Sequence, residues 1–252
     1  MKLKLSLLIF TIFILLFSAS TVSALTVDEI MDKMEETAPD FTTQKTISEM
    51  ILIDKKGNEE VREMIMFSQE GEDGKSSTLV RFLSPKSVKG VTLLNINDGE
   101  KIYLYMPAYG KPKRMAGGDE FMGTGLSYED MSMNFEDKEY ENKLLEETDS
   151  EFIIEVIPSE EDTSYKKIIL TVDKEKFYTK KVEFYDMSEN LTRTLEIAKI
   201  KIDDKGKVTP MEIVFNDIEE NRKTKIVMKE IEYDIELSSS FFSIRTLKKP
   251  TL

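Results

Sequence analysis

Short runs rich in β-branched and aromatic residues, separated by polar turns, cover most of the chain. Turns such as Asn97-Asp98-Gly99 and Asp203-Asp204-Lys205-Gly206 are typical of tight connections between strands. Because parallel strands need long crossovers, these short connections predict an antiparallel meander. Eleven candidate strands follow, at residues 47–53, 61–67, 78–83, 91–96, 101–106, 152–157, 167–172, 180–185, 192–202, 211–218 and 225–237.

Within several of these runs, apolar and polar residues alternate, which predicts a sheet with one apolar and one solvated face. Two examples of a shared apolar face are Ile102, Leu104 and Met106, and Phe152, Ile154 and Val156. A single sheet of this size must curl to hide its apolar side. We therefore expect a mainly β (α+β) fold, in which a curved antiparallel sheet of about eleven strands forms an unclosed barrel with a short helical lid. A two-layer sandwich with an extra helix is the alternative.

One amphipathic helix precedes the strands. Thr26 and Glu29 have the spacing of a capping box, in which each side chain accepts the other residue's backbone N–H. The apolar residues fall on one face at helical spacing, and Pro39 ends the pattern. They are Val27, Ile30, Met31, Met34 and Ala38. A helix with one apolar stripe must pack on an apolar surface.

The first residues have the pattern of an export signal. Lys2 and Lys4 precede an almost unbroken apolar run at residues 5–17, and Val22-Ser23-Ala24 is a small-x-small site. We expect residues 1–24 to be a signal peptide cleaved between Ala24 and Leu25, and residues 25–252 to form a single domain. The alternative is an uncleaved anchor helix over residues 3–25. No Cys follows the cleavage site, so the chain cannot be acylated there.

A long segment interrupts the meander. Residues 107–134 are rich in Gly and contain two Pro, and connections of this length are usually functional. The segment also carries large apolar side chains, namely Phe121, Met122, Met131 and Met133. These groups either fill the open end of the barrel or contact a ligand.

Composition limits the chemistry. The chain has no His, Cys or Trp, which removes a Ser-His-Asp triad, a thiol nucleophile and most zinc sites. The formal net charge is −13, and removing Lys2 and Lys4 with the leader makes it −15. We therefore expect the chain to repel nucleic acid and anionic lipid headgroups at long range, and we expect no nucleic-acid partner. We expect no enzyme activity, no metal and no cofactor. Paired carboxylates that cleave an envelope polysaccharide are the catalytic alternative.

Four sets of residues form a recognisable pattern, which is dense from residue 79 to residue 135 and continues at the C-terminal end. They are Arg81-Phe82-Leu83-Ser84-Pro85-Lys86-Ser87-Val88-Lys89-Gly90, Tyr103-Leu104-Tyr105-Met106-Pro107 with Lys111, Lys113 and Arg114, Phe121-Met122-Gly123-Thr124 with Ser127-Tyr128-Glu129-Asp130, and Phe241-Phe242-Ser243-Ile244 with Leu247. In this order and spacing they resemble the LolA-like outer membrane lipoprotein-sorting protein family.

The resemblance implies an exported, periplasmic, non-catalytic carrier that holds the acyl chains of a lipoprotein or lipid in an apolar cavity. It also implies passage of the cargo between membranes or to an inner-membrane transporter, and we expect a monomer. Candidate cavity and lid residues are Ile102, Leu104, Met106, Phe121, Met122, Phe152, Ile154 and Val156. Arg81 and Arg114 are candidates for the arginine that latches the lid. An envelope sensor or scaffold that binds a partner protein with the same fold is the second interpretation.

Overall fold

A computed structural model describes residues 25–71, 74–131, 140–158 and 163–252. The predicted leader and its cleavage residue Ala24 lie outside these residues, and so does Met133. Leu25, the first described residue, packs beside the core. Among the described residues, no helix has the length and apolar character needed to cross a membrane.

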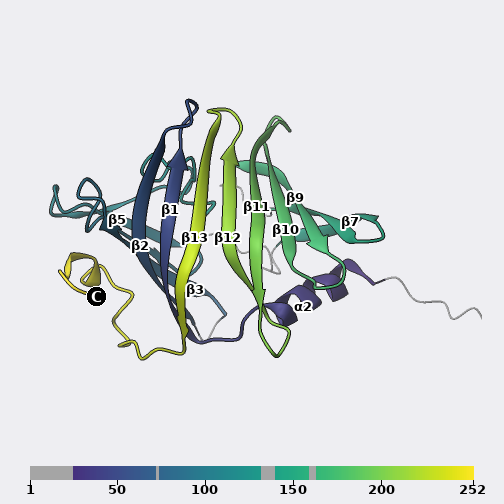
Figure 1. Ribbon diagram of the computed structural model, residues 1–252, viewed down its shortest axis with the longest axis horizontal. Coiled ribbons are helices and arrows are strands. Elements are labelled where there is room, and N and C mark those ends of the chain that lie inside the picture. Colours follow the sequence, from purple (N-terminus) through teal and green to yellow (C-terminus); the bar gives the residue numbers. More distant parts are fainter. Residues whose placement is uncertain (1–24, 72–73, 132–139, 159–162) are drawn as a thin grey trace, which may run out of the picture.

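Thirteen antiparallel strands form one curved sheet that does not close (Figure 1). The strand order is β6-β5-β4-β3-β2-β1-β13-β12-β11-β10-β9-β8-β7, so two meanders meet where β1 pairs with β13. The strands are β1 Thr43–Ile53, β2 Glu59–Glu70, β3 Ser76–Ser84, β4 Thr92–Ile96, β5 Lys101–Tyr105, β6 Pro112–Arg114, β7 Glu141–Glu147, β8 Glu151–Ile157, β9 Tyr165–Asp173, β10 Thr179–Asp186, β11 Leu191–Ile202, β12 Val208–Asp217 and β13 Arg222–Tyr233.

This architecture confirms the predicted fold class, with two more strands than expected. The additional strands, β6 and β7, are the two edges of the sheet. β6 is only three residues long and begins with Pro112, and β7 is mostly charged and exposed. Short, charged edge strands oppose pairing with other chains, and they lack the apolar alternation that identifies a strand.

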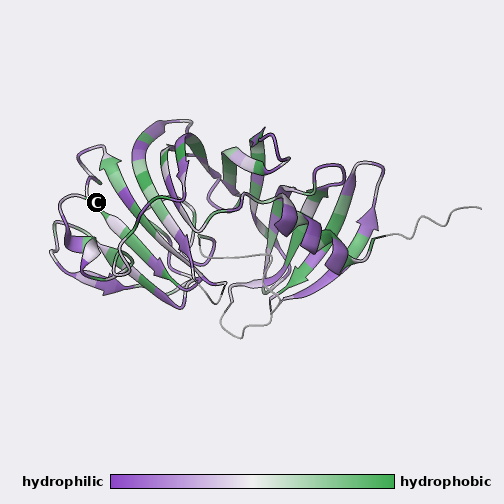
Figure 2. Cartoon of the chain, turned by 90° about the horizontal axis from the view of Figure 1, so that it is seen from below, coloured by the Kyte–Doolittle hydropathy of each residue, from purple (hydrophilic) through white to green (hydrophobic). Residues whose placement is uncertain are grey.

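The predicted helix is α2 (Val27–Thr37), and it lies across the concave face of β7–β10 (Figure 2). Its capping box is formed: Thr26 Oγ1 accepts from Glu29 N at 3.2 Å, and Glu29 Oε2 accepts from Thr26 N at 2.8 Å. Ile30, Met31 and Met34 are buried against the sheet. The helix therefore covers one half of the concave face.

The convex face is not solvated throughout, contrary to the simple alternation. The last strand ends at Tyr233 rather than at residue 237, because Asp234 adopts a left-handed backbone with φ 53°. The following segment folds back over β2–β5 and ends in the short 3-10 helix η1 (Thr246–Lys248). Phe241 and Leu247 cover Phe67, Leu79 and Leu94, which explains the near-continuous burial of β3 and β4.

Replacing Leu247 with Ala tests this C-terminal cover. The side chain is fully buried, so the Leu247→Ala variant should lose about 2–4 kcal/mol of unfolding free energy, measured by urea denaturation. Leu252→Ala, at an exposed position, is the control and should change the free energy by less than about 0.5 kcal/mol. Equal effects of the two substitutions would contradict the burial of Leu247 against the convex face.

Candidate functional site

Two apolar clusters line the concave face of the sheet. The cluster on the β8–β10 side includes Phe152, Ile154 and Val156, together with the buried residues of α2. The cluster on the β2–β5 side includes Ile102 and Leu104, with Met106 partly buried beside them. All six strand positions expected to line a cavity therefore face inward, in two groups on opposite halves of the sheet.

Residues 115–131, which we name the plug segment, cover the half of the concave face that α2 leaves free. Phe121 and Tyr128 are buried in the β2–β5 cluster, and Leu126 reaches the other cluster. The ring of Phe121 stacks on Phe82 at 5.7 Å and meets Tyr128 at 5.6 Å between centroids. Met122 and Met131 are partly buried at its margin. The segment thus fills the concave face with the protein's own side chains.

The plug segment folds as a tight loop. Phe121 N donates to Leu126 O at 2.7 Å, and Thr124 Oγ1 donates back to Phe121 O at 2.6 Å. Gly123 and Gly125 both have φ +74°, a left-handed conformation that favours Gly. At Gly125 a Cβ would also lie 3.2 Å from Asp217 Cβ, so this residue permits close contact with the end of β12.

Two arginines and a threonine, on the strands that flank β1, hold this loop through hydrogen bonds. Arg62 on β2 donates to Met122 O at 2.9 Å, and Thr224 on β13 donates to Thr124 O at 2.6 Å. Arg222 bridges Glu120 at 3.0 Å and Asp217 at 2.8 Å. Charge-assisted bonds of this kind are stronger than neutral ones. The loop is therefore held by these polar contacts as well as by its apolar side chains.

A third arginine holds the end of the plug segment. Asp130 accepts from Arg193 of β11 at 3.1 Å and from the Tyr165 hydroxyl of β9, and Arg193 also donates to the Tyr165 oxygen at 2.5 Å. Burial raises the pKa of the Asp130 carboxyl, and the Arg193 charge opposes that rise. Burial also raises the pKa of Tyr165, with Asp130 adding to the effect.

The two arginines expected as lid latches lie elsewhere. Arg81 is on the convex face, where it donates to the carbonyls of Thr246, Leu247 and Lys249 in the C-terminal segment. Arg114 is exposed on edge strand β6 and donates to Glu100 O at 3.3 Å. Their hydrogen bonds therefore go to the C-terminal segment and to the residue before β5, not to the plug segment. The contacts that sequence reasoning missed come from Arg62, Arg193 and Arg222.

Two of these three arginines leave a recognisable signal in the sequence. Arg62 alternates with Met64 and Met66 on the apolar side of β2, and Arg193 has the same relation to Leu195 on β11. A cation on the apolar face of a strand needs a partner. Asp130 of the plug segment is the partner of Arg193, and Arg62 pairs with Glu60 of its own strand as well as with Met122 O.

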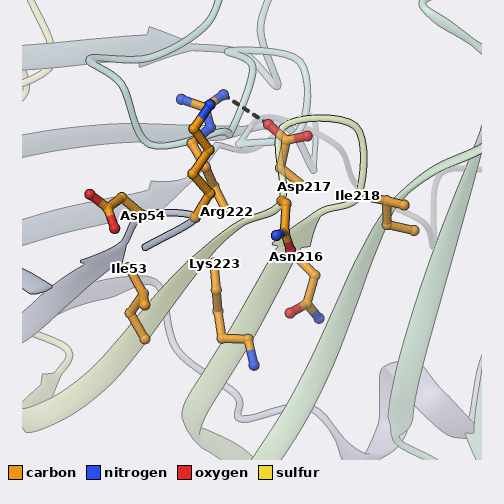
Figure 3. A pocket seen from close by; sticks show the side chains of 9 residues that line it. Ile53, Asp54, Asn216, Asp217, Ile218, Arg222 and Lys223 are labelled. Atoms are coloured by element: carbon orange, nitrogen blue, oxygen red, sulfur yellow. Dashed lines mark hydrogen bonds and ion pairs between the residues drawn. The ribbon is translucent and has the colours of Figure 1, made fainter. Parts of the chain in front are cut away.

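A shallow pocket of about 330 Å³ opens at the end of β1, β12 and β13 (Figure 3). Asp54 and Asp217 both line it, which makes it a place to look for paired catalytic carboxylates. However, Asp54 accepts from Lys56 N, Asn58 N and Asn58 Nδ2 within its own turn, and Asp217 is paired with Arg222. The side-chain hydrogen bond of Asn58 lowers the pKa of Asp54, and backbone N–H groups lower it further. Both carboxylates have structural roles, and nothing in this pocket favours catalysis.

Two glycines of the plug segment offer a matched pair of substitutions. A Cβ at Gly123 meets nothing within 4 Å, so Gly123→Ala should cost only the left-handed backbone strain of about 1–2 kcal/mol. Gly125→Ala adds the 3.2 Å approach to Asp217 and should lose at least about 1 kcal/mol more. Urea denaturation of both variants measures the difference. Equal stabilities would show that the loop does not lie against β12.

The buried tyrosine of the plug segment predicts a pH dependence. Burial raises the pKa of Tyr128 to about 12, with Asp119 contributing, against about 10 in an unfolded chain. The folded state therefore keeps a proton that the unfolded state releases, so stability falls as the pH rises from about 10 to about 12. The loss should be about 1–3 kcal/mol for this group, and Tyr128→Phe should show a correspondingly smaller fall in urea denaturation across that range. The same fall in both proteins would contradict the burial of Tyr128.

Comparisons with known proteins agree with this architecture. A domain from Vibrio parahaemolyticus described as an outer membrane lipoprotein-sorting protein is 24% identical, with a TM-score of 0.81, over 88% of this chain and 98% of that one. A DUF1329 family protein from Desulfovibrio piger is 23% identical, with a TM-score of 0.78, over 87% and 97%. A LolA superfamily protein from Nitrosomonas europaea is 21% identical, with a TM-score of 0.71, over 87% and 98%.

Sequence comparison gives a further assignment. A family model with the description "-like: Uncharacterized protein" matches residues 74–249, which is well over half of the chain. No curated protein sequence matches significantly. The structural matches confirm the resemblance to LolA-like proteins. The chain therefore belongs to the family that this model describes, and it has the LolA-like fold of outer membrane lipoprotein-sorting proteins.

Proposed function

We propose that this protein is an exported, non-catalytic carrier that binds the acyl chains of a lipoprotein or lipid against the concave face of its sheet. In this proposal residues 1–24 direct export and are removed before Leu25. The cargo then travels through the periplasm between membranes, or to an inner-membrane transporter, with the carrier as a monomer. The LolA-like fold supports this class of function.

The proposal is based on the two kinds of contact that the plug segment makes, one apolar and one polar. Its apolar side chains, Phe121, Leu126 and Tyr128, occupy the concave face, whereas its polar contacts are made to three arginines of the sheet, Arg62, Arg193 and Arg222. Acyl chains can take the place of the apolar contacts. Displacing the segment also breaks the polar contacts, and its carboxylates, Glu120 and Asp130, are then hydrated by water instead. The segment is thus suited to being displaced as a unit.

The energetics permit displacement by a cargo with two acyl chains. Burying one methylene contributes about 0.8 kcal/mol, so one chain binds marginally and two bind firmly. The cargo must also offset the free energy that holds the plug segment closed, which lowers its apparent affinity. Flexible Met side chains at the margin, including Met106, Met115, Met122 and Met131, can repack around different acyl chains. A closed resting state of this kind keeps the apolar face out of water until cargo arrives.

Weakening a polar contact between the plug segment and the sheet should therefore strengthen cargo binding. In the Arg193→Gln variant the ion pair to Asp130 is lost, the closed state is destabilised by about 1 kcal/mol, and affinity for a fluorescent fatty acid should rise about fivefold. Lys166→Gln, which removes an exposed cation on β9, is the matched control and should bind like the unmodified protein. Unchanged affinity in Arg193→Gln would contradict displacement of the plug segment.

Native mass spectrometry of the protein purified from its own host tests the carrier function itself. Co-purifying lipid or acylated peptide, identified after organic extraction, is the expected result. A protein that carries no such ligand and also ignores fluorescent fatty acids would contradict the proposal.

The second candidate is an envelope sensor or scaffold that uses the same fold to bind a partner protein. The observation in its favour is that the plug segment fills the concave face in the resting structure. In that case the plug segment stays in place permanently, and Arg193→Gln destabilises the fold without any gain in acyl-chain binding. The fatty-acid titration therefore separates the two candidates.

A further inference from the structure

Positive charge gathers at one end of this acidic protein. Two turns at the β6 edge of the sheet lie together, since a Cβ added at Gly90 in the β3–β4 turn would be 3.0 Å from Pro107 Cγ in the β5–β6 hairpin. These two turns carry five exposed basic side chains: Lys86, Lys89, Lys111, Lys113 and Arg114.

The C-terminal segment adds three more. Arg81 on β3 donates to Lys249 O at 2.8 Å, and its neighbour across the sheet, Thr92, lies opposite Tyr105 at the start of the hairpin. Figure 1 shows the C-terminal coil at the same end of the molecule as β5. The exposed cations of this segment are Arg245, Lys248 and Lys249.

Residues 85–90, 106–114 and 244–249 together form what we name the basic patch. They contain eight Lys and Arg and no Asp or Glu. Subtracting these eight charges from the formal net charge of −13 leaves −21 for the rest of the chain. Among the described residues, none of the eight forms an ion pair. Two carboxylates lie near the patch: Glu63, opposite Ser84, and Glu100, whose backbone carbonyl accepts from Arg114 at 3.3 Å. The patch therefore keeps its full charge.

Apolar groups project from the same surface. Tyr109, at the tip of the β5–β6 hairpin, is 73% exposed, and Ile244 beside the C-terminal cations is 44% exposed. An amphipathic ring such as that of Tyr lies favourably at the level of lipid headgroups, with its hydroxyl in water. Basic side chains around an exposed aromatic tip are suited to a membrane surface, where charge attraction and shallow insertion act together.

We propose that the basic patch binds the surface of a membrane that contains anionic phospholipids. Each Lys or Arg near such a surface contributes about a fivefold gain in affinity, and the attraction falls off within a Debye length. An acidic protein would satisfy the charge but would not explain the exposed tip at Tyr109, so the membrane is the better match. The rest of the chain carries −21 and is repelled by an anionic bilayer, which opposes contact through other surfaces.

The basic patch is directly connected to the plug segment. The β5–β6 hairpin leads directly into the plug segment, with Met115 N donating to Ile102 O at 2.9 Å at the junction. A membrane-bound hairpin therefore brings the plug segment next to the bilayer. The inference extends the proposed carrier function. Vesicles offer acyl chains as well as a charged surface, so surface docking is recognised by its need for anionic headgroups and its loss at high salt, which binding of acyl chains on the apolar concave face does not require. Failure to bind vesicles would overturn the docking, whereas the carrier function is tested separately by the fatty-acid titration.

Sedimentation with lipid vesicles tests the proposal. The full-length mature protein should bind vesicles of phosphatidylcholine with phosphatidylglycerol, not phosphatidylcholine alone, and about 0.5 M NaCl should abolish binding. The triple variant Lys111→Gln, Lys113→Gln, Arg114→Gln should bind at least about tenfold more weakly. The matched control Lys166→Gln, Lys201→Gln, Lys205→Gln removes the same charge from exposed positions elsewhere and should bind like the unmodified protein. Equal loss in both variants, or no binding to any vesicle, overturns the proposal, and the latter result would favour an acidic protein partner.

A spectroscopic experiment locates the contact. Because the chain has no Trp, Tyr109→Trp introduces a single fluorophore at the hairpin tip. Its emission should shift to shorter wavelength when phosphatidylglycerol vesicles are added, and stay unchanged with phosphatidylcholine alone. A Trp placed instead at Met187, an exposed residue of the β10–β11 turn, should show no shift. A shift at Met187→Trp and none at Tyr109→Trp would overturn the orientation.

Discussion

A single strongly curved antiparallel sheet has an apolar concave face that α2, its one α-helix among the described residues, is too short to cover. α2 spans eleven residues and shields only the β7–β10 half. Exposed apolar area of the remaining size is unfavourable in water, so another part of the chain must cover it. The plug segment does so with three large side chains, and its acidic residues give buried or rim arginines a partner. The same need on the convex side is met by the C-terminal segment.

In the proposed carrier, the cover of the concave face separates from the sheet. The strands are joined by continuous backbone ladders, and no part of the plug segment pairs with them along a full strand. Its attachment instead consists of side-chain bonds from several strands and of apolar contacts that another apolar molecule can replace. Local opening of such a segment therefore requires much less free energy than unfolding of the sheet. A carrier needs this difference, because it must expose a binding surface without losing its fold.

The sequence predicts most of the sheet and the helix, but few of the contacts that hold the plug segment in place. Alternation and tight turns identify the inner strands, and Thr26 with Glu29 identifies the start of the helix. The edge strands β6 and β7 are missed because they bury no face, and the near-continuous apolar run of β4 conceals that its outer face is covered by Leu247. The arginines that hold the plug segment are not predicted as such, because their partners in that segment lie far away in sequence. Arg62 and Met122, for example, are 60 residues apart. Net charge likewise conceals the basic patch, since a sum over the chain contains no information on position.

A reversible covalent lock of the plug segment tests whether this segment must be displaced before acyl chains bind. Built on the backbone, a Cβ at Gly125 lies 3.2 Å from Asp217 Cβ, close to the separation of about 3.5–4.5 Å found in disulfides, and the chain has no other Cys. The measurement is fluorescent fatty-acid binding by the Gly125→Cys, Asp217→Cys protein in its oxidised and reduced forms. If the plug segment must be displaced, oxidation should abolish fatty-acid binding and dithiothreitol should restore it. Equal binding by the two forms would contradict displacement of the plug segment as the step that admits cargo.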